Sequence, residues 1–430
     1  PHPVTPEQSI IGQTIFSIND YRHGQTAPSA SQIREYRATQ PAPTPAVRRP
    51  SLALPTLPAL GQQLGRNPLW QSKTLGMTLL AGALIVILLI NLRALSSKRE
   101  TEQQAAAHAA ELVALEDQLE EAKLAKVFNQ PDKARASFQA VLTGADDLVN
   151  TTVAAEAALL ASDAQAELDE LTVTTRLTKL TELASIQDGS ALSLWDGQLS
   201  VLGADGSLLT VPLTGGETST VTAPSSAPPV ATTAFDEKIG LAVLTSAPSV
   251  LELATASGPT APLALTNGSW KAGTALAPFF NTLYVLAPAD NQIWKFASTN
   301  GQFQAPVGYV EDGTAVSGAV DLAIDGSVYV LLGDGQIRKF SRGKVTEFPL
   351  RDIPEPAPTF TAPTQLLTTR DGDALYVLDG HRVVVLDKTG RFQRQYAFAP
   401  ELGDVTRIAI TPDETTLVVL TPTALYSTPL

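Results

Sequence analysis

From about residue 180 onward, the chain repeats one pattern of apolar and polar positions six times. Each copy has a short apolar strand, a turn, a strand that reads close to Leu-Tyr-Val-Leu, a second turn and a strand that ends near Lys-Phe. The six second strands begin at positions 199, 241, 283, 328, 375 and 417, so they lie 42, 42, 45, 47 and 42 residues apart. A period of roughly 40–50 residues with about four strands per unit is typical of a β-propeller. We therefore expect a mainly β fold, with a six-bladed β-propeller over residues 174–430.

Asp-Gly dipeptides mark the turns of this pattern, at 205–206, 325–326, 334–335 and 371–372. Both residues tolerate positive φ, so Asp-Gly between apolar runs predicts tight hairpins. The fourth repeat is the most complete. Its predicted strands are 320–324, 328–332, 336–340 and 346–350.

The last repeat has only three predicted strands, 407–411, 416–420 and 424–428, before the sequence ends at Leu430. Without a fourth strand the ring would leave one strand edge unpaired. Segment 176–183, just before the first repeat, alternates apolar and polar residues. We predict that this segment pairs with the last repeat and closes the ring.

An unbroken apolar run extends from Leu75 to Leu92. Its 18 residues carry no charge, and as a helix they span about 27 Å, close to the hydrocarbon core of a bilayer. Lys73 and Arg93 flank the run, and Trp70 stands where an interfacial aromatic residue belongs. The run predicts a transmembrane helix over 75–92. A buried core helix rarely lacks a polar face over this length, and a cleaved signal peptide is not expected behind 74 residues.

The charges around this helix conflict over its orientation. Two basic residues stand shortly before it and three (Arg93, Lys98 and Arg99) shortly after it, which slightly favours a cytoplasmic C-terminal side. The wider asymmetry favours a cytoplasmic tail, because residues 1–74 carry a net charge of +4 and residues 101–430 carry −19. We follow the second argument and expect the propeller outside the cytoplasm.

Helical patterns fill the segment 93–173. Apolar residues recur at helical spacing from Ala105 to Ala125, and Pro131 is well placed in a first helical turn. A second helix is predicted over 133–142, ended by Gly144, and a third over 152–171. This helical stalk is like a single tetratricopeptide unit, which cannot bury its own face well. We expect it to pack on itself, on a second copy or on the propeller.

Composition narrows the possible functions. The chain has no Cys, which excludes disulfides, thiolate zinc sites and Cys nucleophiles. Its net charge is −13, and the acidic surplus after residue 100 argues against nucleic-acid binding, which needs a basic face. Residues 1–74 form a basic, Pro-rich tail that we predict to be disordered and available to a cytoplasmic signalling partner.

Residues with reactive side chains do not stand in a catalytic pattern. His381 follows an Asp-Gly turn and lacks the partners of a triad, so we interpret it as a turn residue. Asp371 and Asp373 flank a Gly as in a calcium loop, but the further ligands are missing. Asp321 is the main acid on the predicted inner strands. We therefore expect no catalytic residue, no cofactor and no metal ligand.

Binding is expected instead in the loops that join the outer strand of one blade to the inner strand of the next. One such loop contains Asp312, Gly313 and Thr314, and another is the Pro-rich segment from Ile353 to Pro363. Loops of this kind sit on a rigid scaffold and often carry recognition residues.

The phrases LYVL…NQIWKF and VYVLLGDGQIRKF resemble six-bladed NHL-type repeats over about residues 180–430. The order of tail, span, stalk, the segment AELDELTVTTRLTKLTEL (166–183) and propeller resembles two kinds of membrane protein. One is the bacterial proteins in which a PP2C-type phosphatase precedes the span, and the other is the receptor kinases with an extracellular NHL propeller. In those families the propeller is taken to be the sensor or docking part. Residues 1–74 contain neither phosphatase nor kinase motifs, so any signalling enzyme is expected to be absent, upstream of Pro1 or a separate partner.

The sequence thus predicts a single-pass bacterial cell-membrane protein whose propeller acts without catalysis. It would bind a protein or another envelope ligand on its loop face, as a sensor or scaffold in signalling. One alternative is a propeller-class hydrolase, lactonase-like or glycosidase-like, which needs metal-binding carboxylates or a carboxylate pair at the channel mouth. A second alternative is a structural envelope protein with a large self-association surface.

Overall fold

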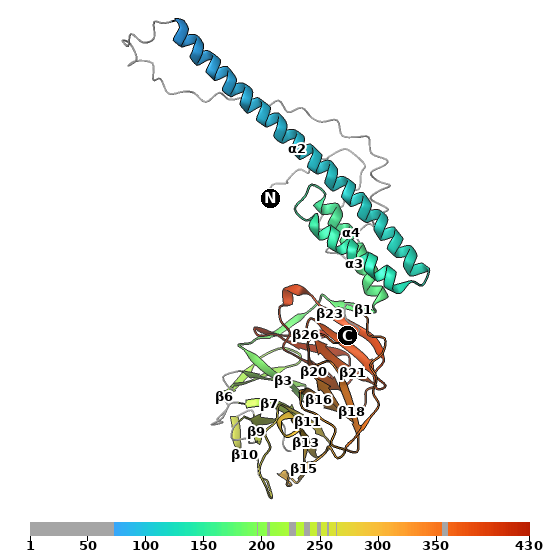
Figure 1. Cartoon of the computed structure of the whole chain (residues 1–430). Helices are drawn as coiled ribbons and strands as arrows, with labels where there is room; N and C mark the ends of the chain where they lie inside the picture. The colour runs from blue at the N-terminus through green and yellow to red at the C-terminus, as the bar shows by residue number, and fades with distance from the viewer. Residues whose placement is uncertain are drawn as a thin grey trace, which may run out of the picture. The chain divides into compact units, whose positions relative to one another are not determined.

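A computed structural model describes residues 73–430 except 196, 204–206, 223–228, 236–240, 247–250, 256–257, 264 and 355–359. The chain divides into two compact units at residue 171, and each is described below by itself. The first unit is helical and the second is built of strands (Figure 1).

The helical unit contains α2 (Lys73–Val127), α3 (Pro131–Asp147) and α4 (Ala154–Leu171). The C-terminal half of α2 and both shorter helices share one apolar core. Its fully buried members include Leu119, Phe138 and Leu160. Lys126 near the end of α2 forms ion pairs with Glu167 and Glu170 of α4, both at 2.8 Å. The apolar stripe of α2 is thus covered within the unit.

α2 is one continuous helix through residue 93, where the predicted span would meet the predicted stalk. One prediction about these helices was wrong, because Gly144 lies inside α3 and does not end it. A Cβ at Gly144 would stand 2.6 Å from a methyl carbon of Leu115, so this glycine allows α2 and α3 to approach closely. Among the residues that the structure describes, none of the helices has a stretch that is both long enough and apolar enough to cross a membrane.

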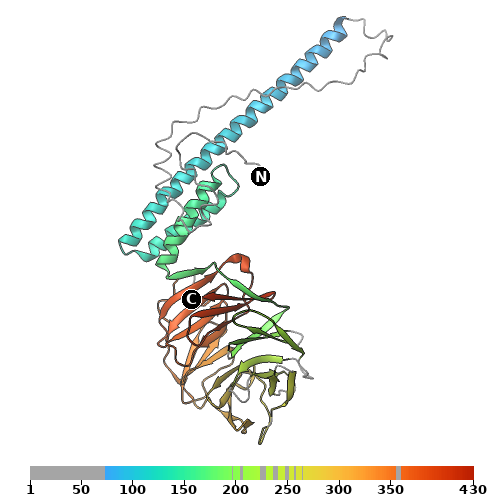
Figure 2. The same ribbon diagram turned by 180° about the vertical axis from the view of Figure 1, so that it is seen from behind.

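The second unit is a β-propeller (Figures 1 and 2). Its described strands form six sheets, each a meander in which an inner strand is followed by strands progressively farther out. The first two sheets are β3 (Gly189–Trp195), β4 (Gln198–Gly203), β5 (Ser207–Pro212) and β6 (Ser219–Thr222), then β7 (Pro229–Ala234), β8 (Leu241–Thr245), β9 (Leu251–Thr255) and β10 (Gly258–Pro262). The third and fourth are β11 (Ala275–Phe279), β12 (Thr282–Ala287), β13 (Gln292–Thr299), β14 (Gln302–Phe303) and β15 (Val307–Gly308), then β16 (Ala319–Ile324), β17 (Val328–Leu332), β18 (Ile337–Ser341) and β19 (Lys344–Thr346).

The last two sheets recruit strands from the start of the unit. The fifth contains β20 (Pro363–Thr368), β21 (Ala374–Asp379), β22 (Arg382–Asp387), β23 (Phe392–Phe398) and β1 (Thr174–Leu177). The sixth contains β24 (Arg407–Ile410), β25 (Thr416–Leu420), β26 (Ala424–Pro429) and β2 (Thr181–Ser185). Short 3₁₀ helices η3 (Pro288–Asp290) and η4 (Pro400–Leu402) lie in two of the connections.

The core of this unit lies between successive sheets. Apolar clusters fill the contacts of the first sheet with the second, the second with the third, and so on, and one cluster joins the sixth sheet to the first. Each sheet is therefore buried on both faces. This explains why all five residues of Val328–Leu332 are apolar and buried. A strand with one solvent-exposed face would instead alternate apolar and polar residues.

The predicted closing strand 176–183 is in fact two strands in two sheets. β1 runs parallel to β23, with Leu177 opposite Phe398, and β2 runs antiparallel to β26, with Thr181 opposite Ser427. The segment must leave one sheet and enter the next, so it cannot stay straight through residues 178–180. Leu177 is buried in the apolar cluster between these two sheets.

The fourth strand of the β16–β19 sheet was also misplaced. It covers Lys344–Thr346, where the prediction was 346–350. Arg342 and Gly343 both have positive φ, at 51° and 82°, which is the geometry of a tight two-residue hairpin turn. The chain therefore reverses immediately after β18. The sequence offered no Asn or Asp at this turn, so the signal was weak.

Candidate functional site

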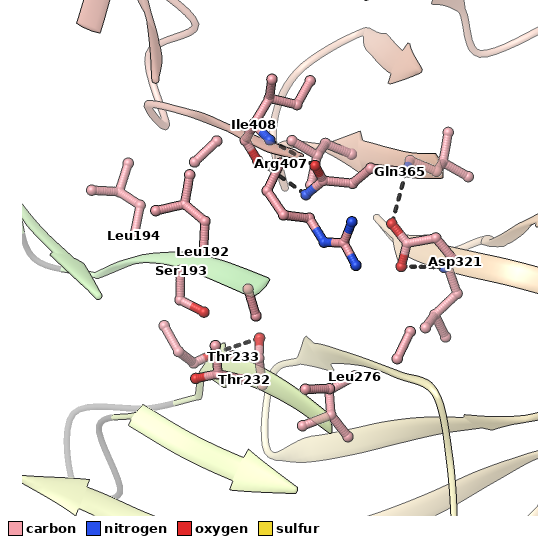
Figure 3. Close-up of a pocket in the computed structure, with 18 of the residues that line it drawn as sticks. Leu192, Ser193, Leu194, Thr232, Thr233, Leu276, Asp321, Gln365, Arg407 and Ile408 are labelled. Atoms are coloured by element: carbon pink, nitrogen blue, oxygen red, sulfur yellow. Dashed lines mark hydrogen bonds between the residues drawn. The ribbon is translucent and has the colours of Figure 1, made fainter. Parts of the chain in front are cut away.

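The six inner strands β3, β7, β11, β16, β20 and β24 surround a central cavity of about 330 Å³ (Figure 3). Each inner strand contacts the inner strand of the next sheet, and β24 contacts β3. Every sheet thus contributes side chains to the same cavity. Most of the polar lining groups are hydroxyls and amides, and the charged ones are Asp321 and Arg407.

One position on each inner strand can be compared around the ring, because it pairs with the same place on the neighbouring second strand. The six pairs are Ala191–Leu202, Ala231–Leu244, Ala275–Leu286, Asp321–Leu331, Gln365–Leu378 and Arg407–Leu420. Three successive strands carry Ala here, and the next three carry long polar side chains. At this one position the ring is therefore apolar on three inner strands and polar on the three that carry Asp321, Gln365 and Arg407.

Asp321 links β16 to β20. One carboxylate oxygen accepts a hydrogen bond from the Leu366 N–H at 2.8 Å, and the other accepts from the Leu322 N–H at 2.9 Å. Burial raises the pKa of Asp321 to about 6, against the lowering effect of these two hydrogen bonds and of the Arg407 charge. The carboxyl group is therefore charged at neutral pH but poorly solvated.

Gln365 repeats this link one strand further on. Its side-chain amide donates to the carbonyl of Ile408 at 3.0 Å and accepts from the Ile408 N–H at 2.7 Å. Gln365 is buried, and both ends of its amide are used. It holds β24 beside β20 and thereby sets the position of Arg407, the residue before Ile408.

Asp321 and Gln365 each bond to the next inner strand, but among the described residues Arg407 forms no such hydrogen bond to β3. Its Nη1 donates to the carbonyl of the preceding residue, Thr406, at 2.8 Å, and the guanidinium projects into the cavity (Figure 3). Among the described residues no ion pair joins Arg407 to Asp321, although their charges interact. Most of the five N–H donors of this guanidinium are left facing the cavity.

Hydroxyl groups stand on the far side of the cavity from Asp321 (Figure 3). They belong to Ser193 of β3 and to Thr232 and Thr233 of β7. The Thr233 hydroxyl donates to the carbonyl of Ala234 at 3.3 Å. The Thr232 hydroxyl oxygen is buried, with no hydrogen-bond partner among the described residues. The cavity can therefore offer donors and acceptors from both sides.

Replacing Asp321 with Asn is expected to change how stability depends on pH. In the unfolded chain this carboxyl has a pKa near 3.8, and in the folded chain about 6. Between these values the folded state keeps the proton that the unfolded state has lost, so the wild type loses stability as pH rises from 4 to 7. The loss attributable to this group is at most about 3 kcal/mol.

The measurement is the free energy of unfolding by urea at pH 4 and pH 7 for the wild type and for the Asn variant. The difference between the two proteins should change with pH, while an Asp371→Asn control on an exposed turn should run parallel to the wild type. A constant difference for Asp321→Asn would contradict the raised pKa.

The structure places the loop residues singled out from the sequence in two different settings. Asp312 and Gly313 are exposed, and the Asp312 carboxylate accepts hydrogen bonds from the N–H groups of Thr314 and Val345, at 3.0 and 2.7 Å. A hydrogen bond from the Thr314 side chain, together with these two backbone bonds, lowers the pKa of Asp312. This carboxylate orders its own loop while one face of it stays in solvent.

The segment from Ile353 to Pro363 is anchored at both ends. Ile353 and Pro363 are buried, as is Phe360. Their side chains therefore hold the loop to the propeller and are not available to a partner. Residues 355–359, the centre of this candidate loop, lie outside the described part of the chain.

The structure also shows where the other residues singled out from the sequence lie. His381 is exposed in the turn between β21 and β22. Asp371 and Asp373 lie in the exposed connection from β20 to β21. Leu75 and Leu92 both lie within α2. Within the described residues no three His, Cys, Asp or Glu side chains lie close enough together to hold a metal ion.

Sequence reasoning found Asp321 but missed Gln365 and Arg407. The signal was present in the repeat, because all three residues precede the second strand of their repeat at a similar distance. Turns of different length separate the first and second strands, so the spacing is 7 residues from Asp321 to Val328 but 10 from Arg407 to Leu417. Only the strand register aligns them.

Comparison with known proteins returns distant structural matches. No protein-family model matches the chain, and no curated protein matches it. Solved structures that match include the WD40 β-propeller domain of Doa1, at 12% identity, over 59% of this chain and 97% of that chain, with a TM-score of 0.39. Another is Kuenenia stuttgartiensis hydrazine synthase, at 11% identity, over 59% of this chain and 99% of that chain, with a TM-score of 0.42.

Proposed function

We propose that this chain is a membrane-anchored binding module, in which a six-bladed propeller of the NHL type recognises a ligand and the helical segment carries location or signal. The observation that carries the binding role is the central cavity. All six inner strands converge on it, and Arg407 presents donors there that have no partner among the described residues. A concave site with a few convergent polar groups is the usual form of a small-molecule site.

The six-bladed assignment is supported by the cyclic order of contacts among the inner strands and by the repeat pattern that resembles NHL repeats. Each of the six sheets would then be one blade. The strands β1 and β2 would tie the first part of the unit to the last two blades, as in a closed ring.

Membrane anchoring is proposed from the uncharged run 75–92 of the sequence, of which only part lies among the residues whose side chains the structure describes. Seven successive large apolar residues, from Leu84 to Ile90, are each at least 55% exposed on α2. Such a surface all around a helix is costly in water and favourable in hydrocarbon. The basic tail would lie in the cytoplasm and the acidic propeller outside it, with a sensor or scaffold role in signalling at the cell envelope.

The full-length chain is expected to stay in the membrane pellet after a carbonate wash. Changing Leu84 and Leu88 together to Lys should release much of it, because each charge at the centre of a span costs about 2.5–3.5 kcal/mol on insertion scales. Val113 and Leu124 are similarly exposed apolar residues of the same helix, at 51% and 56%, so changing both to Lys is the matched control and should leave the pellet unchanged. Wild-type chain in the wash supernatant would refute the anchor.

A propeller-class hydrolase is the second candidate, and the observation that favours it is Asp321. A carboxyl group with a pKa of about 6 in a cavity has the protonation behaviour of a general acid or base. Both of its oxygens already accept backbone hydrogen bonds, which favours a positioning role over proton transfer. Turnover of an ester, lactone or glycoside that disappears in the Asp321→Asn variant would favour the hydrolase.

A further inference from the structure

We propose that the central cavity binds a small zwitterion of the amino-acid class, with its carboxylate on Arg407 and its ammonium group on Asp321. The inference deepens the proposed binding function and rests on it. It starts from the asymmetry of the ring, in which one position of the strand register carries Ala191, Ala231 and Ala275 on three inner strands and Asp321, Gln365 and Arg407 on the other three.

The carboxylate end follows from Arg407. A guanidinium presents paired N–H donors that match a carboxylate in two parallel hydrogen bonds. The corresponding side chains on the two preceding strands, Asp321 and Gln365, form hydrogen bonds with the backbone of the next inner strand, at Leu366 and Ile408 respectively. The guanidinium of Arg407 donates one hydrogen bond to the carbonyl of Thr406 and otherwise faces the cavity (Figure 3). The hydroxyl of Ser193 can add a donor to the same anion.

The ammonium end follows from Asp321. Each of its oxygens accepts one backbone N–H, which leaves further lone pairs able to accept from a ligand donor. A carboxylate in the cavity also disfavours a phosphate dianion, since the second negative charge would have no cation of its own. A ligand with one negative and one positive end satisfies both side chains and leaves no buried charge unpaired.

The spacing between the two poles favours bridging by a ligand over direct pairing. Asp321 and Arg407 sit on β16 and β24, with Gln365 on β20 between them, and they form no ion pair although their charges interact. Gln365 is a positioning residue here, because its amide fixes the backbone of Ile408. The volume of about 330 Å³ is at the small end of ligand sites, so a free amino acid suits it better than a peptide.

The test measures thermal stabilisation of the full-length chain by free amino acids added singly. Each is compared with its N-acetylated form and its carboxamide form. At least one free amino acid should raise the melting temperature, and neither blocked form of that amino acid should do so. Its affinity is then measured by calorimetry, and Arg407→Met should weaken it by roughly 10- to 100-fold, the usual effect of losing hydrogen bonds to a charged group.

Two further variants keep the test decisive. Arg394→Met removes an exposed arginine of β23 outside the cavity and should bind like the wild type. Asp321→Asn should lose the preference for the free amine, so that the free and N-acetylated forms bind alike. If Arg407→Met does not fold, the Asn variant still decides.

The inference would be overturned if the N-acetylated form, which keeps only the carboxylate, stabilised the wild type as well as the free amino acid does. It would also be overturned if binding survived Arg407→Met in a folded protein. A protein that stays with membranes but responds to no zwitterion would also overturn it, and would leave the proposed anchored module standing. The two proposals therefore fail separately.

Discussion

Replacing Asp379 with Ala is expected to lower the free energy of unfolding of the propeller by about 3–5 kcal/mol, as is usual when one partner of a buried ion pair is removed. The Asp379 side chain has no exposed surface and pairs with Arg382 at 2.8 Å. Its other oxygen accepts hydrogen bonds from the N–H groups of Thr361 and Ala362, both at 2.7 Å. The substitution would leave a buried guanidinium without its carboxylate and two backbone donors without an acceptor.

The matched control is Asp352→Asn, which removes the charge but keeps a side chain that tolerates the positive φ of 61° at this residue. Asp352 pairs with Arg391 at the same 2.8 Å, but the two side chains are 59% and 64% exposed. Removal of such a pair usually costs 0–1 kcal/mol, about a fifth of the buried case. Urea unfolding followed by Trp fluorescence measures both variants. Equal destabilisation would show that Asp379 does not act through burial.

The network around Asp379 also explains why the effect should spread beyond one hairpin. Arg382 donates to Gln395 at 3.1 Å, and Gln395 donates to the Thr174 hydroxyl at 2.8 Å. One buried carboxylate thus connects the end of the 353–363 loop, through β21, β22 and β23, to β1. We expect Asp379→Ala to expose that loop to protease as well as to lower stability.

A fragment that begins at residue 188 is expected to lose most of the stability of the propeller, whereas one that begins at residue 172 keeps it. The shorter fragment lacks β1 and β2, so the outer edges of both β23 and β26 are left without partners. It also lacks Leu177 and Ile186, which are buried. Burial of two such side chains contributes about 3–6 kcal/mol, so the melting temperature should fall by on the order of 10 °C.

Unpaired strand edges also recruit other chains, so the shorter fragment should aggregate. Thermal unfolding and size-exclusion chromatography of the two fragments measure both effects. The fragment 172–430 corresponds to the compact unit and serves as the control. Equal melting temperatures and equal elution would contradict the closing role of β1 and β2.

The repeat made the propeller predictable from the sequence. Strands 328–332 and 416–420 were predicted with their observed bounds, because short apolar runs between turn residues are typical of strands buried on both faces. The first helical turn at Pro131 was equally local, since it depends on the φ angle and missing N–H of that residue.

Predictions failed where the deciding contact lies far along the chain. Segment 176–183 alternates like one strand, but its halves pair with β23 and β26, more than 200 residues away, and no local signal divides it. Gly144 has the sequence signature of a helix end, yet it lies inside α3, where the side chain of Leu115 on another helix packs closely against it.

The sequence by itself determined the class of fold, the Asp-Gly turns at 325–326 and 334–335, the absence of Cys chemistry and the apolar run from Leu75 to Leu92, because each depends on neighbours along the chain. Only the tertiary structure brought Asp321, Gln365 and Arg407 together. Strand register places them at one level of the ring, whereas turns of unequal length hide that alignment in the sequence. Their hydrogen bonds reach across sheets, to Leu366 and Ile408, so no local pattern distinguishes the two committed side chains from the arginine that faces the cavity.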